Sequence, residues 1–167
     1  MSGSFFGKYR GVVSSTNDPM AMGRIQARVP DVLGDRDSGW AMPCVPFAGK
    51  GMGFFALPAD GAGVWIEFEH GDPDYPIWSG CWWGSATELP TEVLTPPQSN
   101  KILLRTDGGS SILVDETPGV GGITLTTSTG QKIVVSATGI EIDNGSGASI
   151  KLQGPQVSIN GGALEVT

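Results

Sequence analysis

The last seventy residues, from Gln98 to Thr167, repeat a short pattern in which two apolar residues flank one other residue and a polar turn follows. Successive pairs lie 7 to 11 residues apart. Because side chains alternate between the two faces of a β-strand, each pair places two apolar side chains on one face. The pairs are Ile112/Val114, Ile123/Leu125, Ile133/Val135, Ile140/Ile142, Ile150/Leu152, Val157/Ile159 and Leu164/Val166. The pattern predicts seven short strands, each with one apolar face.

These strands contribute only about two core side chains each, and no longer segment between them could cover their apolar face. A strand also needs hydrogen-bonding neighbours on both sides. We expect the neighbours to come from sister copies of the chain. Three copies wound about a common axis would give every strand two partners and enclose the apolar stripe. The C-terminal region is therefore predicted to be a trimeric β-solenoid, in the form of a rod.

The first half of the chain shows the alternation of a compact β-barrel. In the clearest strand, Ile25, Ala27 and Val29 are expected to point inward, and Pro43 is expected to place another strand at an edge or at a bulge. The candidate strands are Tyr9–Ser14, Arg24–Val29, Trp40–Pro46, Gly53–Leu57, Val64–Glu69 and Ile77–Trp82. Five or six strands with glycine-rich corners favour an OB-like barrel.

Composition separates the two halves. All 5 Trp, 6 Phe and 2 Tyr residues precede residue 85. With 26 Gly, 12 Pro and no sustained helical period, the chain is predicted to be all-β. We expect an OB-fold domain over residues 1–84, a proline-rich linker over 85–97 and a spike of three intertwined chains over 98–167.

The net charge of −7 and the scattered basic residues disfavour nucleic acid as a partner, because phosphate binding requires a basic patch. The N-terminus lacks the pattern of a signal peptide, and no run of apolar residues is long enough to span a bilayer. We therefore expect synthesis in the cytoplasm without membrane anchoring. Cys44 and Cys81 are expected to be buried free thiols, since a cytoplasmic chain keeps its cysteines reduced.

Candidate catalytic groups are few. Glu67 and Glu69, with Asp72 and Asp74 soon after, could form a carboxylate set of the glycosidase type, but a solvent-facing strand followed by a proline turn is the favoured interpretation. His70 has no Ser or Cys at a recognisable spacing, which favours a surface histidine over a catalytic triad. No catalytic, metal-binding or cofactor-binding residue is predicted.

Two glycine-rich segments resemble ligand loops only in part. Gly49–Gly53 lacks the Lys-Ser/Thr end of a phosphate loop and a following helix, so a hairpin loop is favoured. Asp143–Gly147 starts like a calcium loop but lacks the remaining ligands, and its Asn144-Gly145 step favours a turn between strands. The aromatic residues of the barrel could stack on single-stranded nucleic acid, as in other OB-folds, or form the core and subunit contacts.

Several segments of the first half, in order, resemble a known family. They are Gly11-Val12-Val13, Asp18-Pro19, Gly23–Pro30, Trp40-Ala41, Gly53–Pro58, Gly61, Val64–Glu69, Gly71–Pro76 and Gly80. This series is similar to the OB-fold domain of the baseplate assembly protein V and VgrG-like spike proteins of contractile phages, type VI secretion systems, pyocins and extracellular injection systems. The repeat over residues 98–167 resembles the β-helical needle of the same proteins.

The resemblance implies a non-enzymatic homotrimer with an OB-fold collar and a β-helical needle that punctures a target cell envelope. It implies contacts with the baseplate hub and inner tube at the OB end, a PAAR-type cap on an apex formed by Leu164 and Val166, and a place in a phage-tail-like particle. Relatives with a metal-binding apex use His-x-His motifs, whereas the single histidine here is His70, far from the C-terminus. A metal-tipped apex is therefore not expected.

Two other functions stay open at this stage. The first is an OB-fold binding module for oligosaccharide or single-stranded nucleic acid, with the repeat as a stalk. The second is a glycan lyase or hydrolase built on a β-solenoid, which would need clustered acidic residues on one face. Here Asp115, Glu116, Glu141 and Asp143 lie near turns without aromatic platforms.

Overall fold

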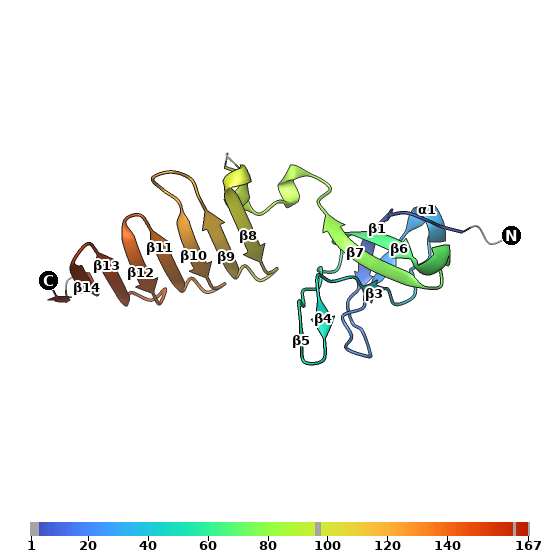
Figure 1. Ribbon diagram of the computed structural model, residues 1–167, viewed down its shortest axis with the longest axis horizontal. Helices are drawn as coiled ribbons and strands as arrows, with labels where there is room; N and C mark the ends of the chain where they lie inside the picture. Colours follow the sequence, from blue (N-terminus) through green and yellow to red (C-terminus); the bar gives the residue numbers. More distant parts are fainter. Residues whose placement is uncertain (1–3, 96–97, 162, 167) are drawn as a thin grey trace. The chain divides into compact units, whose positions relative to one another are not determined.

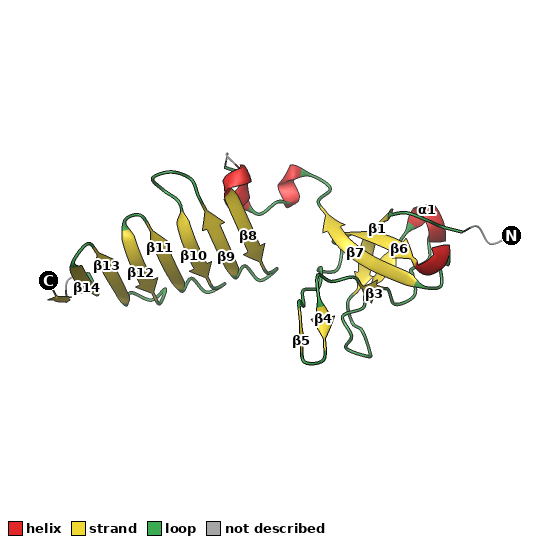
Figure 2. Cartoon of the chain, viewed as in Figure 1, coloured by secondary structure: helices red, strands yellow, loops and turns green. Residues whose placement is uncertain are grey.

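The computed structural model describes residues 4–95, 98–161 and 163–166, with the backbone alone at 99, 165 and 166 (Figure 1). The chain forms two compact units, Met1–Glu88 and Leu89–Thr167. Strands dominate both units, and the helical segments are single short turns (Figure 2). The predicted all-β class is confirmed.

The first unit contains a five-stranded sheet in the order β2-β1-β6-β7-β3. Its strands are β1 (Tyr9–Ser15), β2 (Gln26–Arg28), β3 (Met42–Pro43), β6 (Gly63–Phe68) and β7 (Pro76–Trp82). Three short helical turns complete this unit: α1 (Pro30–Leu33), η1 (Glu69–Gly71) and η2 (Ala86–Glu88). Strands β1, β2, β6 and β7 pair antiparallel, whereas β3 is a two-residue edge strand parallel to β7. Pro43 thus lies at a sheet edge, as predicted.

One predicted strand of this unit is wrong. Over Gly53–Leu57 only Gly53 is in a strand, at the end of β5 (Met52–Gly53), which pairs with β4 (Ala48–Gly49) in a separate two-stranded hairpin. Phe54, Phe55 and Leu57 are exposed on a segment without strand pairing. The segment from Gly49 to Gly53 is the tip of this hairpin, as expected in place of a phosphate loop.

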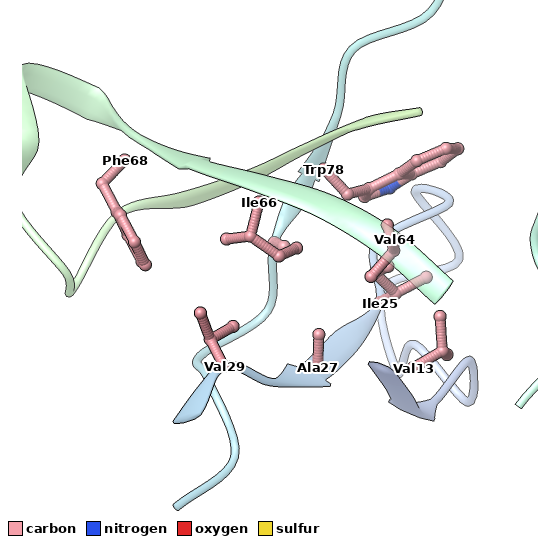
Figure 3. Close-up of a cluster of buried hydrophobic side chains, with 9 residues drawn as sticks. Val13, Ile25, Ala27, Val29, Val64, Ile66, Phe68 and Trp78 are labelled. Atoms are coloured by element: carbon pink, nitrogen blue, oxygen red, sulfur yellow. The ribbon is translucent and has the colours of Figure 1, made fainter. Parts of the chain in front are cut away.

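The core of the first unit lies between strands of this sheet and the segments that cross it (Figure 3). Ile25, Ala27 and Val29 are fully buried, so the inward face predicted from their alternation is confirmed. Among the described residues, the buried hydrophobic cluster consists of Val13, Ile25, Ala27, Val29, Ala41, Val64, Ile66, Phe68 and Trp78. The indole Nε1 of Trp78 donates a hydrogen bond of 3.1 Å to the carbonyl oxygen of Gly23, which pairs the polar atom of this buried ring.

The second unit is one eight-stranded antiparallel sheet in which each strand pairs with the next along the chain. The strands are β8 (Lys101–Arg105), β9 (Ser111–Asp115), β10 (Gly122–Thr126), β11 (Lys132–Ser136), β12 (Gly139–Asp143), β13 (Ser149–Gln153), β14 (Gln156–Ile159) and β15 (Leu164–Val166). Two turns, η3 (Thr91–Val93) and η4 (Gln98–Asn100), precede it. At roughly 4.8 Å between strands, the sheet is about 34 Å from β8 to β15.

This topology overturns one expectation. The strands were expected to take their lateral neighbours from sister chains, but β9 to β14 have both neighbours within the same chain. The reason lies in the connections, which are short enough to reverse the chain between adjacent strands. Ser136 and Gly139, for example, are paired across a two-residue turn. Sister chains are therefore not needed to complete the backbone hydrogen bonding of these six strands.

Part of the segment that was predicted as a proline-rich linker contacts the sheet of the second unit. The ammonium group of Lys101 donates hydrogen bonds to the carbonyl oxygens of Glu92 and Thr95, at 3.0 and 2.8 Å. The guanidinium of Arg105 forms an ion pair with the Glu92 carboxylate. These contacts hold residues 92–95 against strand β8, at the start of the second unit.

Candidate functional site: the apolar face of the C-terminal sheet

The register of the eight strands aligns the apolar residues in two continuous columns. Ile123, for example, lies opposite Val114 on one side and Val135 on the other. The first column consists of Ile102, Val114, Ile123, Val135, Ile140, Leu152, Val157 and Val166. The second column consists of Leu104, Ile112, Leu125, Ile133, Ile142, Ile150, Ile159 and Leu164. Both columns lie on the same face, because column members on each strand are two residues apart.

No described segment of the chain covers this apolar face. Ile142 is 44% exposed and Ile150 is 38% exposed, although both lie on inner strands of the sheet. In a β-sandwich, side chains at such positions are buried against the second sheet. A soluble monomer rarely exposes a continuous apolar surface of this extent, and such surfaces mark contacts with other proteins. The two columns therefore make this face the candidate site for contact with another protein.

The opposite face carries charged residues that suit contact with water. The Glu141 carboxylate lies 3.6 Å from the Lys132 ammonium and 3.5 Å from that of Lys151, on the two neighbouring strands. Lys101 and Asp115 pair in the same way at 3.9 Å. Hydrogen bonds from Thr117 lower the pKa of Asp115, with a smaller contribution from Lys101. The sheet is thus amphipathic, with one face for burial and the other for solvent.

The structure brings together all the predicted needle-core residues and adds two that the sequence analysis missed. Ile102 and Leu104 on β8 extend both columns by one strand. Their spacing was hidden because Leu103 lies between them and makes the run continuously apolar. The charged ends of this run, Lys101 and Arg105, were the signal that a further five-residue strand was present.

At the far end of the sheet, β15 pairs with β14 alone among the described strands. Leu164 ends the second column and is 54% exposed. Val166 ends the first column by its backbone register, and its side chain lies outside the described part of the chain. The predicted apex residues therefore both lie on the terminal strand of the apolar face.

Two of the four candidate carboxylates of the first unit, those of Glu67 and Asp72, make structural contacts. Glu67 lies 3.3 Å from the Lys8 ammonium, and a hydrogen bond with Ser79, followed by the contact with Lys8, lowers its pKa. Asp72 accepts a hydrogen bond of 3.1 Å from the backbone nitrogen of Asp74, within the predicted turn. Among the described residues, no group of three or more His, Cys, Asp or Glu side chains is arranged to hold a metal ion.

The remaining candidates are resolved individually. His70 is exposed and adopts a positive φ of 55° in the turn after β6. Asn144 Oδ1 accepts hydrogen bonds from the backbone nitrogens of Ser146 and Ala148, both at 2.9 Å, so this segment is the expected turn between strands. Cys44 and Cys81 are free, as predicted, but both are exposed, so their predicted burial is wrong.

The aromatic residues of the first unit divide between the core and a surface cluster. The guanidinium of Arg10 lies 5.8 Å from the centroid of the Trp65 ring and 5.1 Å from that of Trp82. This cation–π contact occupies aromatic faces that could otherwise stack on a ligand. Over the described residues, no helix has the length and hydropathy needed to cross a bilayer.

Comparison with known proteins defines the class. Residues 9–83 match the type VI secretion system/phage-baseplate injector OB domain, and residues 101–165 match the phage baseplate V C-terminal trimerisation domain. A barrel of the first kind followed by a sheet of the second defines an injector spike. The chain belongs to the family of phage baseplate V and VgrG-like spike proteins. Both the resemblance drawn from the sequence and the predicted OB barrel are thereby confirmed.

Parts of the chain are similar to several VgrG proteins. The type VI secretion system spike protein VgrG4b of Pseudomonas aeruginosa is 37% identical over 59 residues, which is 35% of this chain and 7% of that protein. The actin cross-linking toxin VgrG1 of Vibrio cholerae is 38% identical over 73 residues, 44% of this chain and 6% of the toxin. The spike protein VgrG5 of P. aeruginosa is 33% identical over 73 residues, 44% of this chain and 9% of that protein. The matches thus span less than a tenth of each relative.

Proposed function

We propose that this protein is the structural central spike of a contractile injection machine, in which three copies bury the two apolar columns against one another. The uncovered apolar face carries this proposal, since it lies within the segment that matches a trimerisation domain. Burial of an Ile or Leu side chain contributes roughly 1.5 to 3 kcal/mol, so columns of this length supply a large association energy. The core residues are those predicted from the sequence, Ile112 to Ile159, with Ile102 and Leu104 in addition.

The mechanism of such a spike is mechanical. Cross-strand hydrogen bonds follow one another along the whole sheet, and the buried columns would join three sheets along their full length. Force applied along this direction would then be shared by many bonds, which allows the tip to pass through a target envelope without bending. This role requires no catalytic group, and the chain matches only the spike part of its relatives, including the toxin.

The proposed partners differ between the two units. The first unit, as an injector OB domain, would contact the baseplate hub and the inner tube. The apex formed by Leu164 and Val166 would bind a PAAR-type cap, and the exposed apolar side chain of Leu164 supports this assignment. The protein would assemble in the cytoplasm and become part of a phage-tail-like particle.

The native mass of the purified protein tests this proposal. A trimer of the 17.3 kDa chain has a mass of about 52 kDa, whereas a monomer at micromolar concentration would contradict the proposed function. Titration of the tryptophan fluorescence with glycans and oligonucleotides tests the alternative of an OB-fold binding module. Saturable binding of either ligand by a monomer would favour that alternative.

The cap requires a separate experiment. Pull-down of a PAAR-type protein with the trimer is expected to succeed for the natural chain and to fail for Leu164→Asp. Leu103→Asp is a matched control, because Leu103 is on the opposite face of β8, at the other end of the sheet. Equal capture by Leu164→Asp and the natural chain would exclude this apex as the binding site.

A further inference from the structure

The outer face of the sheet in the first unit carries a cluster of one cation and two indole rings. Its members are Arg10 on β1, Trp65 on β6 and Trp82 on β7, three strands that lie side by side (Figure 1). Arg10 lies directly opposite Trp65 in the pairing of β1 with β6. Trp65 stands between the buried Val64 and Ile66, so the cluster projects from the face opposite the core.

The two rings form a wedge around the guanidinium of Arg10. The ring centroids of Trp65 and Trp82 are 6.3 Å apart, and the ring planes are inclined by 51°. The Cζ atom of Arg10 lies 5.8 Å from the first centroid and 5.1 Å from the second. A cation–π contact uses the charge of the guanidinium but none of its N–H donors. The side chain is thus ordered in advance while its donors remain available, which lowers the entropy cost of binding a ligand.

Gly63 makes room for this arrangement. It lies opposite Trp82, and a Cβ atom at this position would lie 2.8 Å from two atoms of the Trp82 ring system. A larger residue would therefore displace the ring. The indole Nε1 of Trp82 donates a hydrogen bond of 3.3 Å to the carbonyl oxygen of Val64, which fixes the ring over β6. The sheet thus holds Trp82 where it can contact Arg10.

Arg10 has no acidic partner in the part of the chain that the structure describes. Seven of the ten Lys and Arg residues form ion pairs there, whereas Arg10, Arg36 and Lys50 form none. The Glu67 carboxylate, on the same face of β6 as Trp65, is paired with the Lys8 ammonium at 3.3 Å. The guanidinium of Arg10 therefore keeps its capacity for a carboxylate, in a chain that contains 17 acidic residues.

We infer that this guanidinium binds a carboxylate side chain of a protein partner through its fork of N–H donors. The partner would be the baseplate hub, so this inference rests on the proposed function. Arginine stacked on aromatic rings is favoured for ion pairs in interfaces, and Arg and Trp are enriched among the residues that contribute most to binding. Val12, two residues further along the same face of β1 and 44% exposed, supplies an apolar contact beside the ion pair.

Other anionic ligands fit this cluster less well. Phosphates of a nucleic acid require a basic patch, whereas Lys8, the other basic residue near the start of β1, is already paired with Glu67. A sugar ring would need an open aromatic face, but the Trp82 ring lies against Gly63 and beneath the Arg10 guanidinium. The site therefore favours a single carboxylate on a protein surface.

Binding of the purified hub protein of the same particle to the trimeric spike, measured by biolayer interferometry, tests the inference. Arg10→Ala is expected to weaken binding about 10- to 100-fold, the range for losing hydrogen bonds to a charged group. Arg10→Lys keeps the charge but lacks the planar fork, so a loss of about 3- to 10-fold is expected. Arg36→Ala is the matched control, because Arg36 is an exposed arginine of the same unit without an ion pair or a cation–π contact among the described residues. Its affinity should equal that of the natural chain.

A double-mutant cycle separates a direct contact from a structural effect of Arg10. One Asp→Ala or Glu→Ala variant of the hub is expected to weaken binding of the natural spike and to have no further effect on Arg10→Ala. Strict additivity of Arg10→Ala with every acidic variant of the hub would show that Arg10 contacts none of them, and would overturn the inference.

The remaining outcomes are equally distinct. Equal affinity of Arg10→Ala and the natural chain for the hub, with a native mass of about 52 kDa for both, would overturn the inference alone. Loss of the trimer in Arg10→Ala, or saturable binding of an oligonucleotide or an acidic glycan that requires Arg10, would assign the cluster to another ligand and overturn the inference. A native mass of 17.3 kDa for the natural chain would instead overturn the proposed function.

Discussion

Ile142 lies directly opposite Ile133 on the adjacent strand, and both side chains project from the uncovered face of the sheet. The substitution Ile142→Asp would place three carboxylates, one per chain, in the centre of the proposed trimer core. A buried, unpaired carboxylate is very costly. We expect the native mass to fall from about 52 kDa to 17.3 kDa, as measured by native mass spectrometry.

The neighbouring residue supplies the control for this variant. Glu141→Ala changes the opposite, charged face of the same strand and removes only the ion pairs with Lys132 and Lys151. Surface ion pairs contribute little, about 0 to 1 kcal/mol, so this variant should remain a trimer. A trimer of Ile142→Asp that resists detergent as well as the natural chain does would contradict the proposed core.

The core of the first unit should respond independently of the trimer. Ile66 is fully buried within the barrel, so Ile66→Ala is expected to destabilise this unit by about 2 to 5 kcal/mol through lost transfer energy and a cavity. Urea unfolding followed by tryptophan fluorescence measures the change, since all 5 Trp residues are in the first unit. The native mass should not change. Loss of the trimer together with the barrel would show that the two units depend on each other.

Two glycines of the C-terminal unit make a matched pair. A Cβ atom on Gly122 would lie 2.3 Å from the carbonyl oxygen of Val135, whereas a Cβ atom on Gly108 would have no heavy atom within 4 Å. Gly122→Ala must therefore separate β10 from β11, at a cost of about 1 to 3 kcal/mol per chain. We expect Gly122→Ala to lower the thermal midpoint measured by circular dichroism. The midpoint of Gly108→Ala should stay close to that of the natural chain. Equal midpoints for the two variants would argue against the register of these strands.

The stability of the first unit should depend on pH in the acid range, because of a carboxylate in the loop before β2. The Asp18 carboxylate accepts hydrogen bonds from the backbone nitrogens of Met20 and Met22, at 3.0 and 2.8 Å, and from Arg24 Nε at 3.1 Å. Arg24 contributes most to a pKa of Asp18 far below its ordinary value. A carboxylate with a depressed pKa stabilises the folded state above its unfolded pKa, about 3.9, and this contribution is lost as the pH falls toward the folded value.

Asp18→Asn is therefore expected to lower the thermal midpoint at pH 7, with the difference from the natural chain shrinking below about pH 4, as that stabilisation is lost. Differential scanning fluorimetry over this range measures both effects. Asp60→Asn, at an exposed turn residue, is the control and should leave the midpoint unchanged. A difference between Asp18→Asn and the natural chain that stays constant from pH 7 to pH 2 would contradict the role of the Asp18 charge.

Much of the architecture could be predicted from the alternation of apolar and polar residues alone. The period-two pairs from Ile112 to Ile159 identified the strands and the apolar face, because the side of a strand on which a residue lies depends only on its position along the strand. The burial of Ile25, Ala27 and Val29 followed for the same reason. The missed pair, Ile102 and Leu104, shows the limit of this signal, since a continuous apolar run contains two possible faces.

The amino-acid sequence by itself determined which side chains share a face, the all-β class, the division into an OB barrel and a repetitive sheet, and the family. Only the tertiary structure decided that the strands pair within one chain and that their apolar face stays uncovered. The reason is that a backbone hydrogen bond can be satisfied equally well by a strand of the same chain or of another. The choice depends on whether each connection reverses the chain onto its neighbour, as at Ser136 and Gly139, and this is a property of three-dimensional geometry.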